Sequence, residues 1–207
     1  MTWNDITLRQ WKVLENIHRE DFEDEILYTA EVIQKMFDIK DAMGLTPQEF
    51  QKYVQDLSFL TKEIPDKKLA NVYTINNTKY NFRGNIYELS MAGLMDWRKY
   101  STKIPVDYAE CLSVFMIPDG HTYNDGYDVD KVIEDMDSLP ITDVIKLYTF
   151  FVASLRLSMD ILISYFQRLM KTSKMDKQQK MEVIEKLNQA KEILDMTSSL
   201  THFATQK

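Results

Sequence analysis

Cysteine is almost missing from this chain, because Cys111 is the single one among 207 residues. One thiol cannot form an internal bridge, so a disulfide framework is excluded and we expect a reducing compartment. Glycine and proline are also scarce, at five residues each, which excludes collagen-like and Gly/Pro-rich disordered chains. A chain of this length buries enough apolar surface to fold without a disulfide or a metal.

The sequence also lacks the usual motifs of catalysis and nucleotide binding. Gly120 and Gly126 stand alone, with no Gly-Lys-Ser/Thr after them, so no phosphate-binding loop is predicted. The three histidines are far apart and none begins a His-Glu-x-x-His helix; they are His18, His121 and His202. We therefore expect no enzyme activity, no cofactor, no metal centre and no small-molecule substrate.

A net positive charge is absent as well, since the formal charge is −7 at pH 7. This balance argues against nucleic acid and anionic membranes as partners. A nucleic-acid role stays open as an alternative because of one basic stripe: Lys171, Lys174, Lys177 and Lys180. The first of these lies where a helix is expected to end, and a positive charge there interacts favourably with the helix dipole. The first ten residues carry no basic segment followed by an apolar one, so we expect no signal peptide.

What the chain does contain is typical of a helix-rich globular protein, with 44% hydrophobic and 28% charged residues. Two capping boxes predict helix starts, one from Thr7 to Gln10 and one from Thr46 to Glu49. Pro47 occupies the first helical position of the second box, and this helix is expected to run to about Leu60. Between the boxes, helical spacing places a set of apolar residues on one face: Phe22, Ile26, Ala30, Ile33 and Phe37.

The middle of the chain changes pattern after Pro65. Two short β-prone runs around Asn76-Asn77 predict a small hairpin at about residues 71–83. Ser90 is expected to cap a helix, Pro105 to open another that ends at Pro118, and Asp128 to cap a short one.

A long central helix is predicted from about Thr142 to Lys171. It is apolar nearly all round, so it must be covered by its own domain or partly by another chain. The segment 147–169 is long enough to span a membrane, but it carries Arg156, Asp160 and Arg168, which favour a buried helix. Its aromatic residues are expected in the core; they are Phe150, Phe151, Tyr165 and Phe166.

We therefore predict a mainly α fold: one multi-helix domain over residues 1–171, with a long central buried helix and one small β-hairpin, followed by a C-terminal amphipathic helix, the arm, over 172–207. One side of the arm is apolar and is the candidate partner-binding site. It packs either on its own domain or on a neighbour. The residues of this side are Met181, Ile184, Leu187 and Leu194.

The stretch "PDGHTYNDGYDVDKVIED", residues 118–135, is the one place where acids, glycines and a histidine crowd together. An EF-hand needs oxygen ligands at positions one, three and five, glycine at six and glutamate at twelve. Setting Gly126 at six puts His121 first and Val132 twelfth, and starting from Asp119 puts Asn124 where glycine is required. The stretch is therefore predicted to be a turn-rich loop, in which binding of an adventitious cation stays open.

Taken in order, "ITLRQWKVLENI", "LTPQEFQKYVQDLSFL", "VYTINNTKYNF", "LSVFMIPDGHTYNDGYDVDKVIEDM" and "LPITDVIKLYTFFVASL" resemble a group of small proteins from tailed-bacteriophage structural gene clusters. These clusters are notably those of crAss-like and other Bacteroides phages, and the proteins are often described as tail-assembly-chaperone-like. The resemblance covers roughly residues 5 to 170, and "IPDG" and "YNDGYDV" are its most distinctive pieces.

The resemblance implies a non-enzymatic morphogenesis protein that binds helical segments of a phage structural protein, in the host cytoplasm during assembly. It carries no catalytic residues over to this chain, and the arm falls outside it. The alternative is a structural virion subunit, such as a connector or tail-ring component, that packs against copies of itself and stays in the particle.

Overall fold

The computed structural model describes residues 1–85, 89–103, 105–172, 178, 181, 184 and 185. Within these residues the fold is mainly α-helical with a small antiparallel sheet, as predicted. The bounds of the helices are α1 (Leu8–Glu15), α2 (Glu25–Phe37), α3 (Pro47–Asp56), α4 (Met91–Ser101), α5 (Tyr108–Ser113), α6 (Val129–Asp137) and α7 (Ile141–Thr172). Short 3₁₀ turns cover Trp3–Asp5, Arg19–Asp21 and Leu57–Thr61.

Both predicted capping boxes are confirmed. The Thr7 hydroxyl accepts a hydrogen bond from the backbone N–H of Gln10 at 3.3 Å, and the Gln10 side chain accepts from the Thr7 N–H at 3.0 Å. Thr46 and Glu49 repeat the arrangement at the start of α3. Helix α3 ends at Asp56 and continues as a 3₁₀ turn to Thr61, so the prediction of a helix to about Leu60 is close.

The sheet contains the predicted hairpin and one strand more. Strands β1 (Val72–Ile75) and β2 (Thr78–Phe82) pair antiparallel around Asn76 and Asn77, whose positive φ angles of 47° and 65° suit a tight turn. Strand β3 (Met116–Pro118) pairs with β2 in the register Asn81↔Ile117. This third strand was not predicted.

Three local predictions were wrong. Helix α5 begins at Tyr108 under an Asp107 cap, rather than at Pro105, because the Asp107 side chain accepts from the N–H groups of Ala109 and Glu110. The same helix ends at Ser113, since the residues after it turn into β3. Ile26 of the predicted apolar face of α2 is 58% exposed, because the core side of this helix is formed by Ala30, Val32, Ile33 and Met36.

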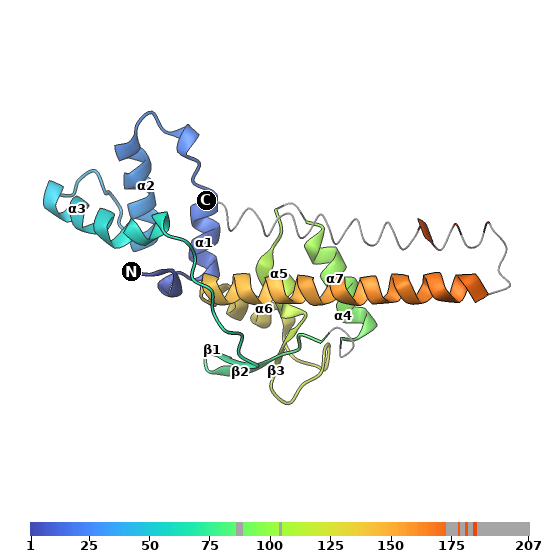
Figure 1. The fold of residues 1–207 in the computed structure, drawn as a ribbon. Helices are drawn as coiled ribbons and strands as arrows, with labels where there is room; N and C mark the ends of the chain where they lie inside the picture. Colours follow the sequence, from blue (N-terminus) through green and yellow to red (C-terminus); the bar gives the residue numbers. More distant parts are fainter. Residues whose placement is uncertain (86–88, 104, 173–177, 179–180, 182–183, 186–207) are drawn as a thin grey trace.

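The core lies around the first half of α7. Val144, Leu147, Phe151 and Leu155 are buried there. Phe115, which precedes β3, stacks on Phe151 with ring centroids 4.1 Å apart. Figure 1 shows α5 on one side of this part of α7 and the sheet on the other, with α6 beside the start of α7. The predicted central helix is therefore confirmed, and its first half is part of the core.

The N-terminus is tied to the junction between α6 and α7. The backbone N–H of Leu8 donates to the carbonyl of Leu139 at 2.8 Å, and the N–H of Ile141 donates to the carbonyl of Ile6 at 2.7 Å. Ile6 and Leu8 are fully buried. The first residues of the chain thus complete the packing around the start of α7.

Candidate interaction surface

The second half of α7 carries exposed apolar side chains. Figure 1 shows it extending beyond the other labelled helices and strands. Leu157 is 64% exposed and Ile161 is 53% exposed, which is unusual for such side chains in a helix with a buried first half. With Phe150 and Tyr165, which are also exposed, they form what we call the α7 stripe. The prediction of core positions was correct for Phe151 and wrong for Phe150 and Tyr165, and the side chain of Phe166 lies outside the described part.

An open groove of about 710 Å³ adjoins the stripe. Phe150 and Leu157 belong to both, so groove and stripe form one continuous surface. The other lining residues come from the chain before β1, from β2 and its exit, and from α7: Leu69, Asn71, Phe82, Gly84, Asn85, Ser154 and Ser158. Its wall therefore offers two phenyl rings together with amide and hydroxyl groups.

Gly84 shapes the wall of the groove. A Cβ atom at this position would lie 2.7 Å from Cε1 of Phe150 and 2.7 Å from Cε1 of Phe82. The two rings themselves are in edge contact, with centroids 5.7 Å apart. Only glycine lets the chain pass this close to both rings. No signal in the sequence pointed to Gly84, because Phe82 and Phe150 meet only in the folded chain.

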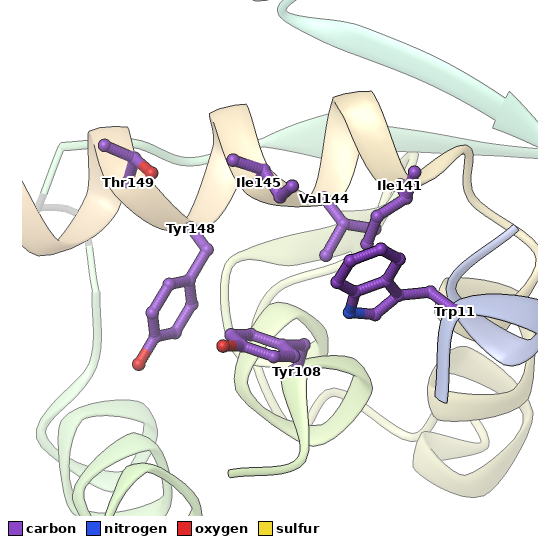
Figure 2. Close-up of a pocket in the computed structure, with 7 residues that line it drawn as sticks. All are labelled: Trp11, Tyr108, Ile141, Val144, Ile145, Tyr148 and Thr149. Atoms are coloured by element: carbon purple, nitrogen blue, oxygen red, sulfur yellow. The ribbon is translucent and has the colours of Figure 1, made fainter. Parts of the chain in front are cut away.

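A second, much smaller cavity lies where α1 and α5 meet α7. Its volume is about 20 Å³, enough for roughly one water molecule and far below that of a typical ligand site. Figure 2 shows Trp11 and Tyr108 facing the side chains of Ile141 and Val144. The Tyr108 ring meets Tyr148 edge to face at 5.0 Å. The exposed wall of this cavity is almost entirely apolar, and burial raises the pKa of Tyr108 to about 12.

The most buried carboxylate, Asp135, serves the fold. Its oxygens accept hydrogen bonds from the Tyr80 hydroxyl at 2.5 Å and the Asn76 amide at 2.8 Å, and Lys131 lies 3.3 Å away. Burial alone would raise the pKa of Asp135, but these hydrogen bonds and the Lys131 charge outweigh it and hold the pKa below its ordinary value. The group joins α6 to the β1–β2 hairpin as a stable carboxylate.

Lys12 links three elements in a similar way. Its ammonium group lies 3.0 Å from Asp107 and 2.8 Å from Asp137. Burial alone would lower the pKa of Lys12, but the bonds to Asp137 and Asp107 outweigh it and raise the pKa. The contact ties α1 to the start of α5 and the end of α6.

The loop at residues 118–130 is built as a series of turns. Gly120, Asn124 and Gly126 have positive φ angles, and Asp128 caps α6 by accepting from the N–H of Lys131 at 3.1 Å, as predicted. Hydrogen bonds from Asn81 and Lys79 lower the pKa of Asp119. In the part of the chain that the structure describes, no three His, Cys, Asp or Glu side chains lie close enough to hold a metal ion.

Cys111 is fully buried, and this burial raises the pKa of its thiol. A protonated, covered thiol is a poor nucleophile. His121 packs its ring edge to face on Tyr127, with ring centroids 5.8 Å apart.

The predicted partner-binding residues of the arm are only partly described. Met181 and Ile184 are helical and exposed, at 62% and 40%, while Leu187 and Leu194 lie outside the described residues. Whether these four residues bind a partner stays a prediction. The sequence did not predict the exposed α7 stripe. Helical periodicity shows which residues of a helix are apolar, but not how much of the helix its own domain covers.

One described helix, Ile141–Tyr165 within α7, is long and apolar enough to cross a membrane. Core helices of soluble proteins pass the same test, and the first half of α7 is such a core helix here, so this carries no conclusion about localisation.

Comparison of the chain with protein-family models, with curated proteins and with solved structures gives no match. The resemblance to phage tail-assembly proteins therefore stays a prediction.

Proposed function

We propose that this chain is a non-enzymatic bacteriophage morphogenesis protein, similar to tail-assembly chaperones, that binds amphipathic helical segments of a phage structural protein. The observation that carries the proposal is the exposure of Leu157 and Ile161 beside an open groove, on a helix that extends beyond its domain. The host cytoplasm during assembly is the corresponding location.

The chemistry of the surface suits such a partner. An amphipathic helix presents its apolar face through residues three and four apart, and Leu157, Ile161 and Tyr165 on α7 follow each other at a spacing of four. Burying one large aliphatic side chain stabilises a complex by roughly 1.5–3 kcal/mol. The net charge of −7 keeps a chain with an exposed apolar surface soluble while it waits for its partner.

The test is binding to phage structural proteins that are produced together with this chain. We expect Leu157→Glu with Ile161→Glu to weaken the complex at least roughly tenfold, because two apolar contacts become charged. Gln51→Glu on the exposed side of α3 is the matched control and should bind normally. Equal binding by the stripe variant and the control would mean that the α7 stripe does not bind the partner.

The same observation favours one alternative, a structural virion subunit. An apolar stripe on a protruding helix also suits packing against symmetry copies in a connector or tail ring. In that case the partner is the chain itself, and the protein forms a defined homo-oligomer.

Quantitative mass spectrometry of purified virions and of the unassembled lysate fraction separates the two. Many copies per particle would establish the structural subunit. Abundance in the lysate with absence from virions would establish an assembly factor that departs.

A further inference from the structure

The turn-rich loop at residues 118–130 contains both Asp-Gly pairs of the chain, Asp119-Gly120 and Asp125-Gly126. An aspartate before a glycine is prone to a spontaneous reaction, because glycine has no side chain to shield its amide nitrogen. That nitrogen attacks Cγ of the protonated aspartate carboxyl, a new N–Cγ bond closes a succinimide ring, and the carboxyl hydroxyl leaves as water with the amide proton. Water then opens the ring, either back to aspartate or to isoaspartate, in which the main chain runs through Cγ.

The surroundings of the two glycines are alike. The φ angle of Gly120 is 82° and that of Gly126 is 71°, and among the described residues a Cβ atom at either position would meet nothing within 4 Å. Asp119 and Asp125 are both exposed. Shielding of the amide nitrogen therefore does not distinguish the two pairs, so the way in which each carboxylate is held decides between them.

Asp119 is held through both its side chain and its backbone. Its carboxylate accepts hydrogen bonds from the Asn81 amide at 2.7 Å and from the Lys79 ammonium group at 3.0 Å. Its own N–H donates to the carbonyl of Lys79 at 2.8 Å, and a bond of 3.1 Å from the N–H of His121 to the carbonyl of Pro118 closes the turn around it. The hydrogen bond from Asn81, followed by the hydrogen bond and the charge of Lys79, lowers the pKa of Asp119, so the protonated acid that the reaction needs is scarce.

Asp125 is held by a much weaker contact. Among the described residues its carboxylate accepts a single hydrogen bond, from the N–H of Thr122, and the length of 3.5 Å is beyond the usual range for such a bond. In the part of the chain that the structure describes, the N–H of Gly126 has no hydrogen-bond partner. The carboxyl group of Asp125 can therefore turn toward this nitrogen without breaking a strong contact.

We propose that Asp125 is a site of spontaneous isomerisation to isoaspartate, and that Asn81 and Lys79 protect Asp119 from the same reaction. The reaction proceeds with water alone and requires no enzyme, metal or oxidant. The inference holds whether or not the proposed function does.

The product lengthens the main chain by one carbon atom inside the loop. The rings of His121 and Tyr127 pack edge to face across this segment with centroids 5.8 Å apart, and Asp128 caps α6 directly after it. An extra methylene between Asp125 and Gly126 changes the spacing of both contacts. The modification therefore acts on the start of α6 as well as on the loop.

Peptide mapping of the full-length protein after incubation at mildly acidic pH tests the proposal. The aspartate and isoaspartate forms of a peptide have the same mass but separate by chromatography, and an isoaspartate-specific methyltransferase labels only the second form. We expect isoaspartate to accumulate at position 125 at least roughly fivefold faster than at position 119, because one ordinary hydrogen bond already changes an equilibrium by about that factor. In protein unfolded by urea, the two positions should react at nearly equal rates, which assigns the contrast to the fold.

Two variants test the cause. Lys79→Ala with Asn81→Ala removes both donors and should raise the rate at Asp119 toward the rate at Asp125. Asp125→Glu is the control for the assignment of the signal. It should remove the isoaspartate of the Asp125 peptide and leave Asp119 unchanged, since the longer side chain closes the corresponding ring far less readily.

Three results would overturn the proposal. The first is an equal or faster reaction at Asp119 than at Asp125 in the folded protein. The second is a folded protein in which Asp125 stays unmodified while the unfolded chain reacts. An unchanged rate at Asp119 in the double variant would show that Asn81 and Lys79 do not protect it.

Discussion

Asp135 is the residue on which the contact between α6 and the hairpin depends. Asp135→Asn should destabilise the protein by about 2–4 kcal/mol near pH 7, because the hydrogen-bonded charge of a buried group is lost. The folded-state pKa of Asp135 is below its ordinary value, so the carboxylate stabilises the fold above that value and ceases to do so as the pH falls through the folded pKa. Urea unfolding at several pH values should show the gap between the two proteins closing under acid conditions. A gap that stays constant would contradict this role.

Gly84 allows a similarly local prediction. Gly84→Ala should cost about 1–3 kcal/mol, because the new Cβ atom enters the space of the Phe82 and Phe150 rings. In a Phe150→Ala background the same substitution should cost clearly less, since one of the two rings is gone. Urea unfolding of the four proteins of this cycle measures the coupling. Purely additive effects would mean that the Phe150 ring does not contribute to the cost.

At the scale of elements, the start of α5 is defined by Asp107, which both caps the helix and pairs with Lys12. Asp107→Ala should therefore destabilise the protein by about 1–2 kcal/mol. Asp107→Asn is the matched control, because it keeps a capping oxygen and loses only the charge, and its loss should be smaller. Denaturant midpoints of the two variants decide this, and identical losses would assign the effect to the ion pair with Lys12 alone.

The elements that could be predicted are those whose signals are local. The boxes at Thr7 and Thr46, the caps at Ser90 and Asp128, and the Asn76-Asn77 turn lie within a few residues of the backbone groups that they satisfy. Strand β3 could not be predicted, because its partner β2 lies more than thirty residues earlier in the sequence. Its three residues are also too few to show the alternating pattern of a strand.

The candidate surface was harder to predict than the helices that carry it. The sequence shows that α7 is apolar nearly all round. Which part of α7 becomes buried is decided by the packing of α1, α5 and the 3₁₀ turn Trp3–Asp5 against it. The groove depends on long-range contacts in the same way, since Leu69, Phe82 and Phe150 approach only after folding.

At the scale of the whole molecule, removal of the arm should change the surface of the domain. The sequence leaves open whether the arm packs on its own domain; in that case a chain ending at Thr172 should bind more of an apolar dye such as ANS and unfold at a lower temperature, because apolar surface of the domain becomes exposed. A chain ending at residue 197 is the control and should behave like the full-length protein. Unchanged dye binding after the larger deletion would mean that the arm contributes no cover.

The hydrogen bonds from Leu8 to Leu139 and from Ile141 to Ile6 also bear on how the protein is made. Ile6 and Leu8 leave the ribosome early, yet the residues that bury them follow about 130 positions later. At a synthesis rate of 5–20 residues per second, they stay uncovered for roughly ten seconds. During that interval the nascent chain exposes apolar segments to chaperones and proteases, so the yield of folded protein in the cell should depend on the speed of translation between these two segments.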